Sequence, residues 1–287
     1  MTFFFLSFTV AICMCSCSFG LVSVPKQFDI SSEGSDGLYT DDLGDEVFFP
    51  VPFLARRDLS CPPATIFNLG LPRTGTTSIS EYTNNLGFKS YHLIRPSFEE
   101  VKSCNDMDGT CDFYRRRGAS DPAARVAFED VPTYGLARAL VMAYPAAKFI
   151  LMVRSPESYS ASVHFMLCNW VRGRCGDINN DDHLKIQTLL YGQAFPNFCE
   201  QVQRRPDLCD DLGRSSVAKR EWNDTGLMKE FRDVQAHHDE TVLKYVPKKS
   251  LLSLDLGATM NADRIFNFLG CNGVAPPFPH ANAILSA

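Results

Sequence analysis

The chain has 287 residues, 45% of them hydrophobic, so it can bury a full core; we expect one globular domain of about 200–230 residues with N-terminal additions. The formal net charge of −5 argues against a nucleic-acid partner, because proteins that bind nucleic acid normally carry a basic surplus. Beyond its first segment, the composition is not that of a membrane protein.

The first segment is an apolar run over residues 3–24 that ends before Pro25. Small residues at Ser18 and Gly20 suit a cleavage site, so a signal peptide over residues 1–24 is the leading prediction. A run of this length can also span a bilayer as an uncleaved membrane anchor, and no Lys or Arg precedes it to bias its orientation. Both alternatives predict a protein of the secretory pathway, anchored or secreted.

An acidic stem is predicted over residues 25–60. Between Gln27 and Ala55 there are seven acids and no Lys or Arg, whereas the rest of the chain, with Lys26 set aside, has 26 acids and 27 bases. Such a Gly/Ser/Asp-rich stretch buries too little apolar surface to fold, so we expect a flexible, solvated linker.

Eight of the 11 cysteines lie in the remaining part, residues 61–287, which we predict to be the folded domain. An even number behind a secretory leader indicates disulfides, and zinc is disfavoured because there are no paired C-x-x-C motifs. Eight cysteines allow 105 connectivities, so the pairing is a hypothesis. A glycosylation sequon at 223–225 is compatible with luminal exposure. The pairs we predict from proximity and from the two ends of the domain are Cys104–Cys111, Cys168–Cys175, Cys199–Cys209 and Cys61–Cys271.

From Ala64 the sequence alternates between short β-prone runs and helical patterns. Strands are predicted at 65–69, 88–92, 125–128, 148–153 and 250–254. Helices are predicted at 76–86, 134–144, from 156 onward and at 261–269. This alternation predicts an α/β fold with a doubly wound parallel sheet covered by helices on both faces. The polar residues 173–220 are hard to assign.

The first strand runs into Gly70-x4-Gly75, and a helix follows, which is the geometry of a phosphate-binding loop. Arg73 supplies a cation there, and Thr76 and Thr77 supply hydroxyl groups. The nucleotide-hydrolase form of this loop requires Lys where Thr76 stands, so a triphosphate-splitting enzyme is disfavoured. An ordinary Gly-containing turn is the alternative.

A second anion-binding motif follows the apolar strand at 148–153. Arg154 comes at the carboxyl end of that strand, where open α/β sheets bind ligands, and Pro156 is suited to the first turn of a helix. Ser162 lies two turns further along, so Arg154 and Ser162 can converge on one phosphate.

Residues 71–78, L-P-R-T-G-T-T-S, resemble the 5′-phosphosulfate loop of the P-loop sulfotransferase superfamily, commonly P-K-S-G-T-T. The Arg variant is similar to the luminal, Golgi-type branch, which includes tyrosylprotein sulfotransferases. Arg154-x-Pro-x5-Ser162 resembles the 3′-phosphate motif of that superfamily, whereas the R-K-G segment of cytosolic members is missing. Segments that resemble a little-characterised sulfotransferase branch are Asp130-x-Pro132, Tyr144-Pro-x-x-Lys148, Phe268-Leu-Gly270, Pro276-Pro-Phe-Pro-His280 and Asn282.

The resemblance implies a sulfotransferase that uses 3′-phosphoadenosine 5′-phosphosulfate (PAPS), needs no metal, and modifies a hydroxyl or amine of a glycan, protein or small-molecule acceptor in the Golgi lumen or beyond. The alternatives are a catalytically silent luminal nucleotide-binding protein and a P-loop small-molecule kinase. The cofactor-binding residues it implies are Pro72, Arg73, Thr74, Gly75, Thr76, Thr77, Ser78, Arg154 and Ser162.

The catalytic base has two candidates. His92 ends the second predicted strand, and an imidazole can take up a proton near neutral pH. Luminal and bacterial family members are similar in placing Glu near this point, so His is a departure. Asp130, with Glu129 beside it, is the competitor, and Arg73 would stabilise the leaving group.

Other polar residues are predicted to lie outside the site. His164, His237 and His238 fall in helical stretches that we expect to be solvated, with structural roles. The run Arg115–Arg117 is expected to be a solvated patch, or alternatively to attract an anionic acceptor such as a sulfated glycan.

Overall fold

The computed structural model describes residues 38–40, 46–48, 59–106, 111–170, 175, 181–192, 194–209, 226–256 and 261–279. The chain divides after Glu33, and residues 34–287 form one compact unit. The predicted leader at 1–24 and the sequon at 223–225 lie outside the described residues. Among the described helices, none is both long and apolar enough to cross a membrane.

A seven-stranded sheet has the order β1-β2-β4-β5-β3-β6-β7. The five strands from β4 to β7 in this order are parallel, as predicted for an α/β fold. In chain order they are β3 (Ala64–Asn68), β4 (Lys89–Leu93), β5 (Arg125–Phe128), β6 (Lys148–Val153) and β7 (Leu251–Asp255). Each lies within one or two residues of its predicted strand. β3 is the middle strand of these five, so the loop that follows it emerges at the centre of their carboxyl edge.

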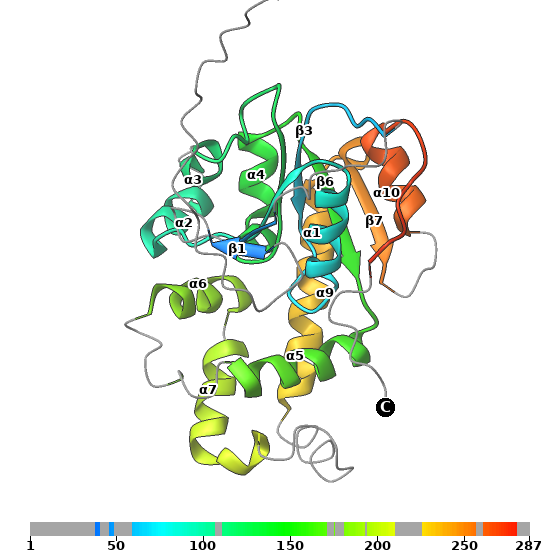
Figure 1. Ribbon diagram of the computed structural model, residues 1–287. Coiled ribbons are helices and arrows are strands. Elements are labelled where there is room, and N and C mark those ends of the chain that lie inside the picture. Colours follow the sequence, from blue (N-terminus) through cyan, green and yellow to red (C-terminus); the bar gives the residue numbers. More distant parts are fainter. Residues whose placement is uncertain are drawn as a thin grey trace, which may run out of the picture. The chain divides into compact units, whose positions relative to one another are not determined.

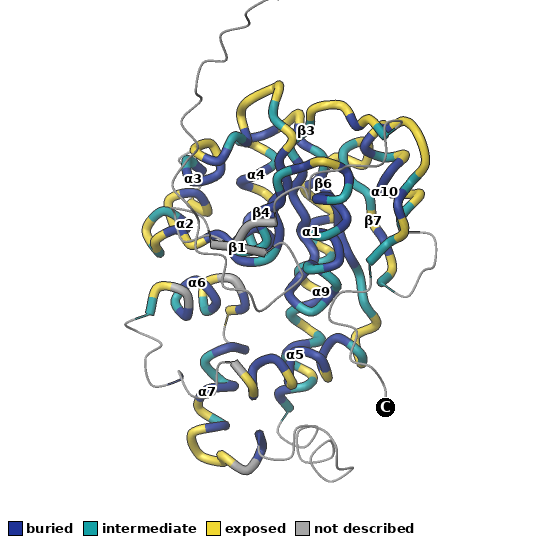
Figure 2. Tube along the Cα trace, viewed as in Figure 1, coloured by how far each residue is buried: buried dark blue, intermediate teal, exposed yellow. Residues whose placement is uncertain are grey.

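Helices cover both faces of the sheet, which confirms the doubly wound arrangement (Figure 1). Helix α1 (Thr76–Asn85) and α10 (Asn261–Leu269) pack on one face, and α4 (Ala137–Ala143) and α9 (Leu227–Tyr245) pack on the other. Neighbouring strand residues point to opposite faces. Ile66 joins the α1 side whereas Phe67 joins the α9 side, and both are fully buried. Most residues of the central strands β3, β5 and β6 are therefore buried, and the less buried ones lie at strand ends (Figure 2).

Part of the predicted stem is in the sheet, so the linker prediction for residues 25–60 is wrong at this point. β1 (Leu38–Thr40) pairs antiparallel with β2 (Glu46–Phe48), and β2 pairs antiparallel with β4. Acidic composition suggested a solvated chain. However, the three-residue runs LYT and EVF carry β-prone residues between the acids, and the open edge of β4 supplies backbone partners.

The remaining helices cluster around these layers. α2 (Phe98–Asn105) begins at a Ser97–Glu100 capping box, and α3 (Asp112–Arg115) follows it. The 3₁₀ turn η1 (Thr133–Leu136) leads into α4, and η4 (Lys248–Ser250) leads into β7. Beyond β6, α5 (Pro156–Trp170) starts at the predicted residue. The stretch that the sequence left unassigned contains α6 (Asp182–Tyr191), α7 (Ala194–Arg204) and η3 (Pro206–Cys209).

All eight cysteines of the domain form disulfides, but only two of the four predicted pairs are correct. Cys61–Cys271 and Cys104–Cys111 are present, whereas the structure has Cys168–Cys209 and Cys175–Cys199 in place of the other two. Proximity in sequence failed here because α5, α7 and η3 fold back on one another. That packing brings Cys209 to the end of α5 and Cys199 to Cys175. The two disulfides are nested, with Cys175–Cys199 inside Cys168–Cys209, and together they link α5, α7 and η3.

Candidate active site

The phosphate loop has the strand–turn–helix geometry that its sequence predicts. β3 ends at Asn68, whose side-chain oxygen accepts from the Gly70 amide at 3.0 Å. The Thr74 hydroxyl donates to the Leu71 carbonyl at 2.6 Å and is buried, so Thr74 holds the turn. α1 begins at Thr76, and its first amides face the loop, as in an anion cradle. Pro72 and Ser78 are buried parts of the same segment.

Gly75 shows why a side chain is excluded from this cradle. Its φ is +98°, and a Cβ there would lie 2.6 Å from Leu256 Cδ1. At Gly70 a Cβ would lie 2.6 Å from the Thr74 hydroxyl oxygen, so the loop closes only around glycine.

We expect Gly75→Ala to lower the free energy of unfolding by about 1–2 kcal/mol through its left-handed backbone, and also to weaken nucleotide binding because Leu256 and the loop must move apart. Gly226→Ala is the matched control: its φ is +78°, but no atom of the described residues lies within 4 Å of the added carbon. Chemical unfolding and titration with adenosine 3′,5′-bisphosphate measure both effects. Equal binding by the two variants would contradict this role of Gly75.

The two anion-binding motifs meet at the carboxyl edge of the sheet. Arg154 follows β6, and its Nη1 donates to the Arg73 carbonyl oxygen at 2.9 Å, while its Nε donates to the Ser158 hydroxyl at 2.7 Å. Arg73 in turn donates from Nε to the Ser162 hydroxyl at 3.0 Å. The two motifs therefore meet, although Ser162, which was predicted to converge with Arg154 on one phosphate, accepts from Arg73, and Arg154 donates to Ser158.

Two partly buried guanidinium groups that lie close together favour the binding of an anion. Burial lowers the pKa of Arg154, and the neighbouring charge of Arg73 lowers it further. Burial also lowers the pKa of Arg73, which the carboxylate of Asp130 opposes. Both groups stay charged at neutral pH because arginine does not lose its proton in proteins. A bound phosphate or sulfate would relieve their mutual repulsion.

Both candidate bases lie against the threonines of this loop. The Thr77 hydroxyl is 3.3 Å from His92 Nε2, and the Ser80 hydroxyl is 3.2 Å from His92 Nδ1. Thr76 donates to Asp130 Oδ2 at 3.2 Å. His92 and Asp130 are both partly exposed, whereas the adjacent Glu129 is fully buried.

Two side chains of α9 form hydrogen bonds with the backbone just after β3 and β6, the strands that lead into the two motifs. Gln235 Nε2 donates to the Arg154 carbonyl at 2.7 Å, and His238 Nε2 lies 2.7 Å from the Leu69 carbonyl. Burial lowers the pKa of His238 to about 4, so its ring is neutral and Nε2–H is the donor. The prediction that His238 is solvated is therefore wrong, because the ring turns from α9 toward the end of β3.

His164 and His237 differ from each other. His237 is exposed, as predicted, but His164 is buried in α5, and burial lowers its pKa to about 4. His164 lies beside Cys168 and Cys209, a trio with metal-like spacing. The two sulfurs are bonded to each other, so they do not offer thiolates to a metal in this state.

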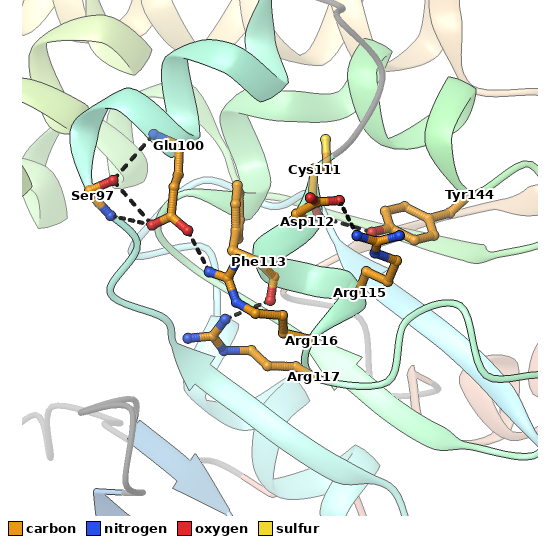
Figure 3. Close-up of polar contacts among 9 residues, drawn as sticks. All are labelled: Ser97, Glu100, Cys111, Asp112, Phe113, Arg115, Arg116, Arg117 and Tyr144. Carbon is orange, nitrogen blue, oxygen red and sulfur yellow. Dashed lines mark hydrogen bonds and ion pairs between the residues drawn. The ribbon is translucent and has the colours of Figure 1, made fainter.

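Each arginine of the run Arg115–Arg117 has a hydrogen-bond or ion-pair partner in α2 or α3 (Figure 3). Arg115 pairs with Asp112 at 3.1 Å, and Arg116 pairs with Glu100 of the α2 capping box. Arg117 is buried and donates to the Phe113 carbonyl at 2.5 Å. The expectation of a solvated patch thus fails for Arg117, and the other two arginines already have carboxylate partners.

Sequence reasoning missed several residues around the site. Ser158 stands one turn after Arg154, a spacing that could have pointed to it. Gln235 and His238 lie on the face of α9 that carries Leu227, Phe231 and Val242, so their helical spacing was a readable signal. Ser80 gave no sequence signal, because only the packing of α1 on β4 brings it to His92, and Glu129 was noted only as the neighbour of Asp130.

Comparison with known proteins assigns the class. Residues 65–284 match the sulfotransferase domain family, which covers most of the chain, and the chain belongs to that family. Ava biosynthesis cluster protein M of Aspergillus versicolor is 34% identical over 119 residues, which are 37% of this chain and 44% of that protein. The chain thus spans less than half the length of this curated relative.

A solved structure is similar at a lower level. The crystal structure of a sulfotransferase from Alicyclobacillus acidocaldarius aligns with 72% of this chain and 81% of its own, at 16% identity and a TM-score of 0.37. The family assignment therefore rests on the sequence match, and the fold on the sheet described above.

Proposed function

We propose that this protein is a PAPS-dependent sulfotransferase that transfers a sulfuryl group to a hydroxyl or amine of an acceptor, with a carbohydrate or protein favoured. Family membership supports the reaction class. In the reaction, the acceptor oxygen or nitrogen forms a bond to sulfur, the bond from sulfur to the 5′-phosphate oxygen breaks, and adenosine 3′,5′-bisphosphate leaves. The acceptor gives up one proton to a base.

The observation that carries the proposal is the meeting of two anion-binding motifs, through the contacts Arg154–Arg73 and Arg73–Ser162. PAPS has negative charge at both its 5′ and 3′ positions, so it requires two cationic groups in one site. The donors present fit that need, because both guanidinium groups are partly buried and their side chains contact only hydroxyl and carbonyl oxygens in these bonds.

Each motif has a separate task in this proposal. The amides of residues 74–77, the Thr76 and Thr77 hydroxyls and the Arg73 guanidinium hold the 5′-phosphosulfate and stabilise the charge that develops on the leaving phosphate. Arg154, Ser158 and Ser162 bind the 3′-phosphate. Neither task needs a metal ion, since arginine and amide groups supply the positive potential.

His92 is the better candidate for the base. Its Nε2 lies beside Thr77, at the start of α1 where the sulfuryl group is held. Asp130 instead accepts from Thr76 at 3.2 Å and interacts with the charge of Arg73, so it is engaged with the loop residues themselves. We assign Asp130 to the orientation of Thr76 and Arg73.

The binding part of the proposal is tested by Arg154→Ala. The variant loses charge-assisted hydrogen bonds that contribute about 1.5–3 kcal/mol. The binding of adenosine 3′,5′-bisphosphate is therefore expected to weaken by about 10- to 100-fold, and the binding of adenosine 5′-monophosphate much less. Arg116→Ala is the control, because Arg116 is exposed and pairs with Glu100 far along the chain from the motifs. Isothermal titration measures both ligands. An equal loss for the two ligands would contradict a 3′-phosphate role.

The activity part is tested by transfer of radiolabelled sulfate from PAPS to panels of glycans, peptides and small alcohols. Bisphosphate binding with no transfer to any panel would favour the silent nucleotide-binding alternative. Binding of ATP·Mg²⁺ without binding of the bisphosphate would favour a kinase. The disulfides support a further proposal, that the protein works in the secretory pathway or Golgi lumen or is secreted, either soluble or held by an N-terminal anchor.

A further inference from the structure

Glu129 is a buried carboxyl that the proposed reaction does not use directly. It follows β5, has no exposed surface, and receives the Ser90 hydroxyl on Oε2 at 3.0 Å. Ser80 and Thr83 of α1 also form hydrogen bonds with it. Burying a carboxyl costs free energy unless its oxygens are satisfied, and here three hydroxyl groups from two elements converge on it.

One of these hydroxyls continues to the site. Ser80 Oγ, which bonds Glu129, also lies 3.2 Å from His92 Nδ1. On the other side of the ring, His92 Nε2 lies 3.3 Å from the Thr77 hydroxyl. The side chains of Glu129, Ser80, His92 and Thr77 therefore form a continuous path from the interior of the sheet to the phosphate loop.

The direction of the hydrogen bond between Ser80 and Glu129 decides the position of one proton. Ser80 has a single hydroxyl proton, and when a carboxyl oxygen of Glu129 accepts it, that proton is not available to His92. Ser80 can then only accept from His92, so Nδ1 must carry the ring proton of the neutral imidazole. His92 Nε2 is left with its lone pair, in the direction of Thr77 and the loop.

We propose that Glu129 is a positioning residue: through Ser80 it holds His92 in the Nδ1–H tautomer, so that Nε2 is available to take the proton of the acceptor. This inference rests on the proposed function only for its consequence, since the tautomer itself is a property of the free protein. It also gives a role to a buried carboxyl at a position where an apolar side chain would avoid the free-energy cost of burial.

The effect of Glu129 on His92 through Ser80 does not require the ionised form of Glu129. Burial raises its pKa to about 8, the hydroxyl groups of Ser80, Ser90 and Thr83 lower it, and Asp130 raises it. In the neutral acid one oxygen can still accept from Ser80 when the acid proton lies on the oxygen that faces Ser90, and the Ser90 hydroxyl then accepts that proton instead of donating. Glutamine keeps this arrangement, with its carbonyl toward Ser80 and its amide toward Ser90, whereas leucine removes it.

The test is the ¹⁵N NMR spectrum of histidine in the full chain, with the His92 signals assigned by their loss in His92→Gln. The wild type and Glu129→Gln are expected to show the Nδ1–H tautomer. Ser80→Ala and Glu129→Leu are expected to shift the population to Nε2–H. Ser90→Ala is the matched control, because it removes a hydroxyl from the same carboxyl without touching His92. Glu129→Leu in a Ser80→Ala background should add no further tautomer change.

A wild type in the Nε2–H form, or equal shifts in Ser80→Ala and Ser90→Ala, would overturn the inference. Should Glu129→Leu fail to fold, the two serine variants decide it. With an active acceptor, kcat of Ser80→Ala is expected to fall about 10- to 100-fold with little change in the KM for PAPS. If the variants show the predicted tautomers but no acceptor is sulfated, the proposed function is contradicted and the role of Glu129 stands. If transfer depends on His92 but Ser80→Ala and Glu129→Leu leave the His92 tautomer unchanged, the role of Glu129 is contradicted and the proposed function stands.

Discussion

Replacing His92 by alanine is expected to lower kcat at least about a hundredfold, the contribution typical of a positioned general base. The effect should appear in kcat more than in the KM for PAPS, because His92 is assigned to proton transfer and the binding of the phosphates is assigned to the loop and the arginines. Single-turnover transfer from radiolabelled PAPS to an acceptor found in the screen measures the chemical step directly.

The control for His92→Ala is Asp130→Asn. If Asp130 orients Thr76 and Arg73, its amide variant should raise the KM for PAPS and lower kcat by a smaller factor than His92→Ala. Near-normal turnover by His92→Ala together with an inactive Asp130→Asn would exchange the two roles and make Asp130 the base.

Arg73→Ala is expected to lower kcat about 10²–10³-fold, as for the removal of a donor that stabilises charge in the transition state. Arg73 is suited to this task because it lies within the loop and is partly buried, where its charge is poorly screened. Arg73→Lys should recover only part of the activity, since lysine keeps the charge but cannot reproduce the planar fork.

The matched control for Arg73→Ala is Arg115→Ala, which removes an equal charge from an exposed pair with Asp112. It should leave kcat unchanged. A rise in the KM for PAPS with kcat intact in Arg73→Ala would mean that Arg73 binds the ground state and transition state equally, and would contradict the assigned role.

The parts of the fold that could be predicted are those encoded by local patterns. The apolar runs of β3 and β6 and the change to helical spacing at Thr76 and Pro156 gave the strand–loop–helix units within one or two residues. The meeting of Arg73 with Arg154 was also predictable, because parallel strands bring their carboxyl ends to one edge.

The features that escaped prediction depend on tertiary packing. Cys168 pairs with Cys209 rather than with Cys175 because α5, α7 and η3 fold back together, and polar residues between them show no period that reveals this. β1 and β2 are too short to give an alternating pattern, and the acids around them dominate the composition. Ser80 and Glu129 become neighbours only because α1 packs on the end of β5, which no single segment encodes.

The positions of the two phosphates in a crystal structure with adenosine 3′,5′-bisphosphate test the central claim most directly. We predict the 5′-phosphate on the amides of residues 74–77 near Arg73, and the 3′-phosphate on Arg154 with Ser158 or Ser162. A nucleotide bound elsewhere, or one phosphate contacting both arginines while the other faces solvent, would contradict the proposed donor site.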